Sequence, residues 1–260
     1  MSSDKSKEKK DRMIAVVSGK GGTGKTVCAL NVAAALRSIG KDVMLVDADV
    51  EDPNLGISLG IHSPDMSLNH VLEGRKNPDE AVHVHDTGLF VIPSSLSINY
   101  TDTDFQFFSD AMKKLDGYVV ADCGPGVNDK LVSVLEAADT SIVVTNPMRT
   151  SLSGALRVIE LIRDIGTDIE GLVLNNLTSK ELYKEEIEAI TGCEIIEEIP
   201  YDKMVDESIT HKRPLLDHVP YSNTSHAFRR IAHRITGEEH ELTLSEKART
   251  LYNSFRSIFH

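Results

Sequence analysis

The stretch from Ser18 to Thr26 reads SGKGGTGKT, and its residue types and spacing are those of a phosphate-binding loop. Glycines let backbone N–H groups close around phosphate oxygens, and a helix that begins at the end of the loop adds the positive end of its dipole. Lys25 can reach the outer phosphates, and the hydroxyl of Thr26 can bind Mg²⁺. The alternative is an ordinary glycine-rich turn, but the apolar run before the loop and the helical pattern after it favour a P-loop.

Three aspartates follow apolar runs that are typical of strands. Asp47 and Asp49 lie in DVMLVDADV, and Asp122 ends GYVVAD. Because ligands bind outside the carboxyl ends of parallel strands, we expect these carboxylates near the P-loop. They could hold the water shell of Mg²⁺ and orient a water molecule for attack on a γ-phosphate. For Asp47, the alternative that a strand-end aspartate only caps the next turn stays open.

The elements that must position these residues alternate along the chain from Met13 onward. Short runs rich in Val and Ile, each followed by a helical pattern, are typical of a parallel sheet covered on both faces. We therefore expect an α/β fold with a mostly parallel, twisted sheet. The expected strands cover residues 13–18, 42–47, 88–93, 117–122, 141–146, 171–176 and 194–200, and the expected helices cover residues 28–40, 104–115, 128–138, 152–165 and 180–190.

Composition limits the kind of protein. The 260 residues suit one sizeable domain, and a formal net charge of −12 argues against a nucleic-acid partner. The three cysteines form no CxxC pair, so we expect no disulfide framework, and we interpret Cys123 as a small buried residue. Since no secretory signal and no membrane-spanning run occur, we expect a cytoplasmic protein.

Several motifs follow one another over residues 13 to about 236: KGGTGKT, VDADxxxPNL, ADCGPG, VTNP, LVLNN and IPYD. Together they resemble the deviant Walker A P-loop ATPases of the MinD/ParA class, and most of all its MinD branch. The resemblance implies a P-loop NTPase fold, ATP or ADP and Mg²⁺ as ligands, and a homodimer in the ATP state. We divide the chain into a disordered tail (1–12), the ATPase domain (13–237), a linker (238–243) and a C-terminal amphipathic helix (244–260).

The resemblance gives a meaning to the second lysine of the loop, Lys20. In the family this lysine crosses to the ATP of a second subunit when two protomers enclose two nucleotides face to face. A cation from a partner stabilises charge on the transferred phosphoryl group, as an arginine finger does. The resemblance implies that Lys20 and Lys25 are catalytic and that hydrolysis is slow and dimerisation-dependent. The alternative is a surface lysine that the loop tolerates.

The resemblance also assigns roles to the acidic residues and to the loop after Asp122. Asp49 is the switch I residue that positions the attacking water. Asp47 and Asp122, together with Thr26, support Mg²⁺. The switch II segment that senses the γ-phosphate contains Gly124, Pro125 and Gly126.

The base pocket is implied in the same way. Asn175 matches the adenine contact of the family, with Asn176 as the alternative if the strand register differs, and the backbone near Pro200 and Asp202 completes the pocket. At Val27 relatives commonly have a hydroxyl residue, and at Met148 they commonly have an acidic one, so two contacts differ here. The implied nucleotide-binding residues are Gly19, Lys20, Gly21, Gly22, Thr23, Gly24, Lys25, Thr26, Val27, Asn175, Pro200 and Asp202.

The last segment, 244–260, carries an apolar stripe at helical spacing and a net charge of about +2. Such a helix suits a membrane interface, as in MinD relatives, so we expect peripheral binding to the inner face of the cell membrane. The alternative is that the stripe packs on the protein's own domain. The residues expected to face the membrane are Leu244, Leu251, Tyr252, Phe255, Ile258 and Phe259.

The resulting hypothesis is an Mg²⁺-dependent ATPase switch that dimerises on ATP, binds a membrane and a protein activator or cargo, and positions a cellular structure such as the division site. One rival is a ParA-like ATPase that segregates DNA or another cargo. The other is a metal-centre maturation ATPase, which would carry paired cysteines, although one cysteine from each protomer could also meet across a two-fold axis.

Two weaker signals receive plain interpretations. The pair His83 and His85 is interpreted as a solvated strand face rather than a metal site, because no further ligand stands at suitable spacing. The basic cluster from Arg229 to Arg234 is interpreted as the exposed side of a core helix rather than a nucleic-acid contact.

Overall fold

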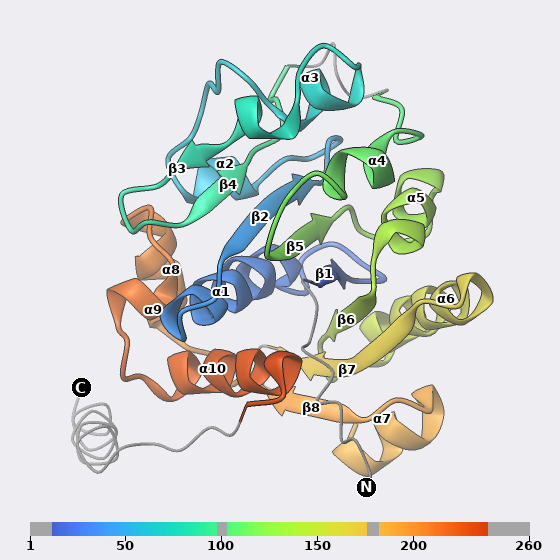
Figure 1. Cartoon of the computed structure of the whole chain (residues 1–260). Coiled ribbons are helices and arrows are strands. Elements are labelled where there is room, and N and C mark those ends of the chain that lie inside the picture. The colour runs from blue at the N-terminus through green and yellow to red at the C-terminus, as the bar shows by residue number, and fades with distance from the viewer. Residues whose placement is uncertain (1–11, 98–102, 176–181, 239–260) are drawn as a thin grey trace, which may run out of the picture.

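The strands of the computed structural model form one sheet in the order β3-β4-β2-β5-β1-β6-β7-β8 (Figure 1). The structure describes residues 12–97, 103–175 and 182–238. Neighbouring strands are parallel, except that β3 runs antiparallel to β4 at the edge. The strands are β1 (Met13–Val17), β2 (Val43–Ala48), β3 (His83–Val84), β4 (Phe90–Ile92), β5 (Tyr118–Cys123), β6 (Thr140–Thr145), β7 (Asp168–Leu174) and β8 (Ile195–Glu198).

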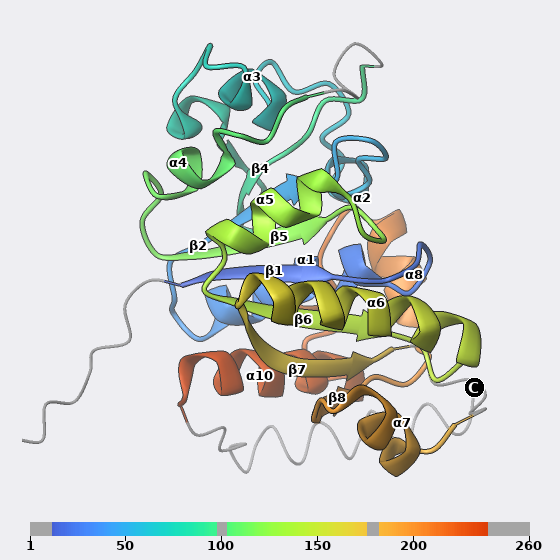
Figure 2. The ribbon, with the colours of Figure 1, turned by 90° about the vertical axis from the view of Figure 1, so that its right-hand side faces the viewer.

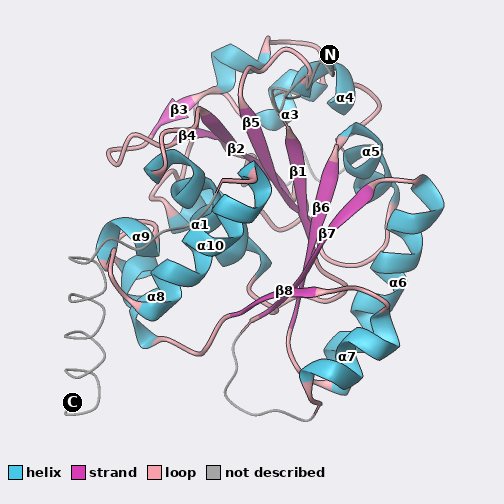
Figure 3. Cartoon of the chain, turned by 60° about the horizontal axis from the view of Figure 1, so that its bottom comes forward, coloured by secondary structure: helices cyan, strands magenta, loops and turns pink. Residues whose placement is uncertain are grey.

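Helices cover both faces of this sheet, which confirms the predicted fold class (Figure 2). Figure 3 shows α1 and α10 side by side on one side of the strands, and α6 and α7 on the other. The helices are α1 (Lys25–Ser38), α2 (Leu55–Ser58), α3 (Leu68–Leu72), the 3₁₀ helix η1 (Pro78–Ala81), α4 (Phe108–Met112), α5 (Asp129–Ala137), α6 (Arg149–Ile165), α7 (Lys184–Thr191), α8 (Lys203–Thr210), α9 (Leu215–His218) and α10 (Asn223–Thr236).

The central strands are buried on both faces, which is why their sequences are apolar almost throughout. All five residues of β1 and all six residues of β5 and of β6 are buried. Each predicted strand overlaps an observed one. The parallel order brings the carboxyl ends of β1, β2 and β5 to one edge, where the P-loop begins.

The basic cluster lies on the exposed side of α10, as predicted. Phe228, Ile231 and Ile235 are buried against α1 and the sheet, while two arginines on the opposite side form ion pairs. Arg230 donates two hydrogen bonds to Glu197, at 2.7 and 2.9 Å. Arg230 is therefore paired with an acidic residue of the same domain.

Two sequence-based expectations are wrong in detail. The helix expected over residues 104–115 is reduced to α4, because the carboxylate of Asp104 accepts a hydrogen bond from the backbone of Gln106 and holds the preceding segment as a turn. His83 and His85 do not form a solvated face, since their rings bond the backbone carbonyls of Met66 (3.0 Å) and Lys212 (2.9 Å). The strand expected at these histidines is present as β3, but its antiparallel pairing with β4 was not expected from the sequence.

The predicted C-terminal helix, its linker beyond residue 238, most of the N-terminal tail and the alternative base contact Asn176 lie outside the described residues. No described helix has the length and apolar character needed to cross a bilayer.

Gly117, directly before β5, offers a test of how closely the backbone packs against Asp42 at this end of the sheet. Its φ is +81°, and an added Cβ would lie 2.6 Å from the carbonyl oxygen of Asp42. Gly88 has the same φ of +81° but open space around the corresponding position. Alanine at either site carries a backbone cost of about 1–2 kcal/mol, and Gly117→Ala adds a clash. We expect Gly117→Ala to lower Tm by several degrees more than Gly88→Ala in thermal unfolding followed by circular dichroism. Equal shifts would contradict the clash.

Candidate nucleotide and magnesium site

The P-loop connects β1 to α1 and leaves the start of the helix open. Gly24 caps α1 with a left-handed backbone (φ +88°), and no side chain caps the helix. The hydroxyls of Ser18 and Thr23 both donate to the carbonyl of Lys20, at 3.1 and 3.4 Å, and hold the turn. The first N–H groups of this 14-residue helix are therefore available for an anion.

A close backbone contact fixes the first glycine of the loop against α6. A Cβ on Gly19 would lie 1.9 Å from the carbonyl carbon of Gly154, and a Cβ on Gly154 would lie 2.7 Å from the oxygen of Gly19. Neither position can carry a side chain without displacing the loop. Sequence reasoning missed Gly154, because a glycine inside a helical pattern gives no sign of what it touches.

The three predicted aspartates meet at the edge of the sheet beside Lys25. Asp47 and Asp122 are register partners on adjacent strands, and both are fully buried. The ammonium of Lys25 lies 2.7 Å from Oδ1 of Asp122 and 3.8 Å from Oδ2 of Asp49. Lys25 thus forms ion pairs with two of the three carboxylates, in a region shielded from water.

Burial is the main cause of the altered acidity here. It raises the pKa of Asp47 well above its usual range, and the neighbouring charge of Asp122 raises it further. Burial also raises the pKa of Asp49, against the opposing effect of Lys25. Burial disfavours the charged form of Lys25, but attraction to Asp122 outweighs it and raises the lysine pKa.

The donor set fits Mg²⁺. The Oδ2 atoms of Asp47 and Asp122 are buried and have no hydrogen-bond partner within the described chain. Buried polar atoms without a partner are costly, and carboxylate oxygens are the ligands that Mg²⁺ prefers. Asp47 and Asp122, with the hydroxyl of Thr26 at the start of α1, are the residues that would hold the ion or its water shell. The ion would neutralise charge on the phosphates.

A cavity of about 150 Å³ lies on the other side of the P-loop. Its walls include Gly22, Gly24 and Val27. They also include the predicted base-contact residues Asn175, Pro200 and Asp202, which lie far along the chain from the P-loop. The side-chain amide of Asn175 donates to the carbonyl of Thr23 at 2.9 Å, so the amide oxygen remains as an acceptor. An acceptor at this position suits the exocyclic amine of adenine.

The remaining walls of this cavity were not predicted. Tyr201, Val205 and Phe228 line it together with Pro200 and Asp202. The carboxylate of Asp202 caps α8 by accepting from the backbone of Met204 at 2.9 Å, so this side chain is engaged in the fold. The tyrosine beside Pro200 was visible in the motif IPYD, whereas the helical residues carry no local signal.

The segment predicted as switch II contacts the loop and the acidic cluster. The backbone N–H of Gly126 donates to the carbonyl of Ser18 at 2.9 Å. A Cβ on Gly124 would lie 3.3 Å from Oδ1 of Asp49. Pro125 lies between the two glycines. The predicted switch II segment is therefore bonded to the P-loop and lies close to Asp49.

Lys20 is exposed, unlike Lys25, and its ammonium forms no ion pair with any described residue. Cys123 is buried, as expected, and burial raises the pKa of its thiol. Burial also raises the pKa of Cys28 to about 12. Neither thiol is a reactive nucleophile near neutral pH.

A family model named ParA, described as NUBPL iron-transfer P-loop NTPase, matches residues 9–236. The chain is 32% identical to the uncharacterized ATP-binding protein MJ0547 of Methanocaldococcus jannaschii, over 93% of this chain and 94% of that protein. It is 30% identical to the antiactivator FleN of Pseudomonas aeruginosa, over 86% of each chain. It is 28% identical to the septum site-determining protein MinD of Bacillus subtilis, over 95% and 97% of the two chains.

Solved structures of MinD proteins resemble this chain in fold as well. The cell division ATPase MinD of Pyrococcus furiosus superposes with a TM-score of 0.82 at 28% identity, covering 87% of this chain and 99% of that one. MinD of Pyrococcus horikoshii, complexed with Mg-ADP, gives 0.80 at 27% identity, covering 86% and 95%. The MinC:MinD complex of Aquifex aeolicus gives 0.79 at 26% identity, covering 89% and 98%.

The charge of Asp47 provides a test of the metal site. A carboxyl whose pKa is raised by folding destabilises the folded state at pH values above its ordinary pKa. This destabilisation shrinks as the pH falls from the raised pKa to the ordinary pKa, below which it is absent. At neutral pH, Asp47→Asn should therefore raise the Tm of the nucleotide-free protein by a few degrees. The same change should lower the Mg²⁺-dependent part of ADP affinity about tenfold.

Differential scanning fluorimetry and fluorescent-ADP titrations with and without Mg²⁺ measure the two effects. Asp65→Asn, at an exposed aspartate, is the control and should alter neither quantity. A lower Tm in Asp47→Asn would contradict the argument that the ionised carboxylate of Asp47 destabilises the folded protein when no metal ion is bound.

Proposed function

The chain belongs to the ParA family of P-loop NTPases, and we propose that it works as a MinD-type switch. In this proposal ATP drives homodimerisation, the dimer binds a membrane and a protein partner, and slow hydrolysis returns the protein to the monomer. Family members that resemble it are ATPases, and one of them was solved with Mg-ADP. Mg²⁺ and ATP or ADP are accordingly the proposed ligands.

The contrast between the two loop lysines carries the proposal. Lys25 is buried and bound to Asp122, so it serves the nucleotide of its own subunit. Lys20 is exposed beside the same loop and free of described ion pairs, so it can reach a phosphate outside its own subunit. A second cation brought in by dimerisation would complete charge stabilisation at the γ-phosphate, which links turnover to assembly.

Asp49 is the proposed water-positioning residue. It forms an ion pair with Lys25 and lies close to Gly124, so we expect its position to depend on the P-loop and on switch II together. A carboxylate held in this way could orient water only when both segments are in place. An activator that shifts either segment would then change the rate of hydrolysis.

The cellular role is proposed from the relatives. Similar proteins include septum site-determining MinD and the antiactivator FleN, and one solved neighbour is a MinC:MinD complex. These names support a switch that positions a structure through protein partners. Division-site placement is the preferred role, with residues 244–260 as the membrane anchor.

The two rivals receive less support. A DNA-segregating ATPase needs an attraction to polyanions that a net charge of −12 opposes. A metal-centre maturation ATPase needs thiols on its surface, but Cys28, Cys123 and Cys193 are all buried. Charge and thiol burial therefore favour the MinD-type proposal.

Lys20→Ala should lower ATP turnover about 10²-fold while ADP affinity changes little, because the missing group acts on the transition state. Asp49→Ala should also lose turnover and accumulate as an ATP dimer. Mixing the two variants gives the sharper result. A mixed dimer contains one site with its own Asp49 and the partner's Lys20, so hydrolysis should reappear at up to about half of the wild-type rate. A steady-state phosphate-release assay measures this, with Lys113→Ala as the control. If Lys20 acted within its own subunit, mixing would restore nothing.

Liposome co-sedimentation tests the membrane part of the proposal. We expect the full chain to sediment with anionic vesicles in ATP and to stay in solution in ADP, with Asp49→Ala used to maintain the ATP state. A chain ending at Leu242 should stay in solution in both nucleotides, because paired weak anchors give the avidity. Sedimentation of the shortened chain, or of neither chain, would reject the tail as a switchable anchor.

A further inference from the structure

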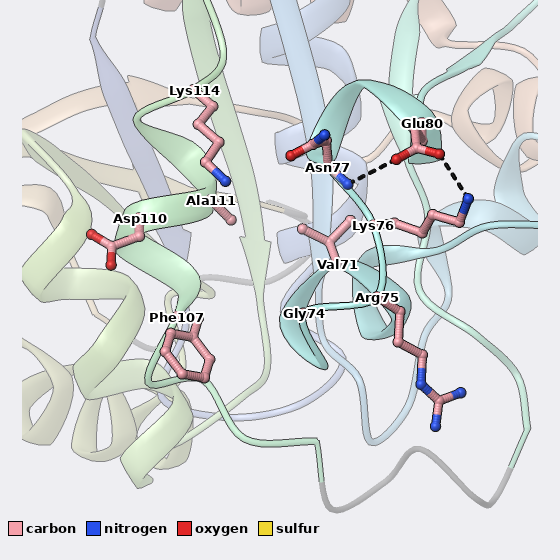
Figure 4. Close-up of a pocket in the computed structure, with 10 residues that line it drawn as sticks. All are labelled: Val71, Gly74, Arg75, Lys76, Asn77, Glu80, Phe107, Asp110, Ala111 and Lys114. Atoms are coloured by element: carbon pink, nitrogen blue, oxygen red, sulfur yellow. Dashed lines mark hydrogen bonds and ion pairs between the residues drawn. The ribbon is translucent and has the colours of Figure 1, made fainter.

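A cleft of about 380 Å³ lies between α4 and the segment that joins α3 to η1, away from the P-loop (Figure 4). Its walls combine apolar and charged groups. Val71 and Ala111 are buried beneath it, and Phe107 stands at its edge with 51% of its surface exposed. The neighbouring aromatics Phe105 and Phe108 are buried and stacked on each other, so Phe107 is the ring left to meet a ligand.

The charged side chains around the cleft differ in whether they have hydrogen-bond or ion-pair partners. Glu80 accepts from Lys76 at 2.7 Å and from the backbone of Asn77 at 3.1 Å, so this carboxylate is satisfied. Lys114 has no side-chain ion-pair or hydrogen-bond partner in the part of the chain that the structure describes. Figure 4 shows its ammonium directed toward the space between the two walls, while the carboxylate of Asp110 is turned away. The cleft therefore presents an unpaired positive charge next to apolar surface.

We propose that this cleft is a docking site for a partner protein's acidic segment that carries an aromatic or aliphatic residue beside its carboxylate. Lys114 would pair with the carboxylate, and Asn77 lies on the opposite wall. The apolar side chain would cover Val71 and Ala111 and pack on the ring of Phe107. The cleft volume suits an anchor of one or two side chains rather than a whole helix.

The wall formed by α3 is tied to the metal site by buried hydrogen bonds. The Oδ1 atom of Asn69, on α3, accepts from the backbone of Ser95 at 2.8 Å. The next residue back, Ser94, donates its hydroxyl to the carbonyl of Asp47 at 2.7 Å. Asn69 is fully buried and Ser94 nearly so, which makes this route short and shielded from water.

A partner in the cleft would thus act on Asp47 through α3 and the segment after β4. Because coupling between two ligands is reciprocal, the partner and Mg-ADP should change each other's affinity. This second step rests on the proposed nucleotide site. The docking site itself does not depend on hydrolysis.

Peptide selection on the full-length protein tests the docking site. We expect a display library of random peptides to yield sequences with Asp or Glu next to an aromatic or aliphatic residue. Fluorescent synthetic copies should bind Lys114→Glu about tenfold more weakly. Lys113→Glu is the matched control, since this adjacent lysine is exposed but does not line the cleft, and its affinity should be unchanged. Enriched peptides without acidic residues, or equal binding to both variants, would overturn the proposal.

The coupling is measured with a selected peptide and Mg-ADP. In the wild type, saturating peptide should change Mg-ADP affinity about fivefold or more. Ser94→Ala should reduce that change while leaving peptide affinity in the absence of nucleotide unaltered. A wild type without coupling would overturn the link to Asp47. Failure to bind Mg-ADP without any peptide would instead count against the proposed function, so the two failures are distinguishable.

Discussion

The rest of the structure depends on a cluster of three buried carboxylates beside one lysine ammonium. The register of β2 and β5 places Asp47 beside Asp122, and the loop before α1 places Lys25 between Asp122 and Asp49. With all groups ionised, the cluster carries two more negative charges than positive ones. A parallel sheet with helices on both faces keeps water away from it, so solvent does not balance this charge, and the proposed Mg²⁺ would.

The backbone of the P-loop is held from three directions, by two backbone contacts and by one side-chain amide. Gly19 meets Gly154 of α6, Thr23 receives the amide of Asn175 from the end of β7, and Ser18 receives the N–H of Gly126. Two of the contacting elements have proposed roles, Asn175 in base recognition and Gly126 in phosphate sensing, and α6 fixes the position of the loop. A nucleotide that moves the loop therefore moves all three, which is what a switch requires.

The sequence was most informative where chemistry and local geometry coincide. Apolar runs ending in aspartate predicted the strands and the meeting of Asp47 with Asp122, because parallel strands put their ends at one edge. The fold class and family were predictable for the same reason. The roles of Gly154 and Phe228 were not, since they arise from tertiary contacts. His85 was misread because the carbonyl it bonds belongs to Lys212, far along the chain.

The central position of β1 has a consequence for how the chain is made. β1 leaves the ribosome before the other described strands, yet it pairs with β5 and β6, and Thr23 is 152 positions from Asn175. Pairings of such long range form late, after the cost of closing the intervening chain has been met. A nascent chain therefore contains the complete P-loop motif long before the candidate nucleotide site has formed. A chain stalled before β7 would carry the P-loop motif without the hydrogen bond from Asn175 to Thr23.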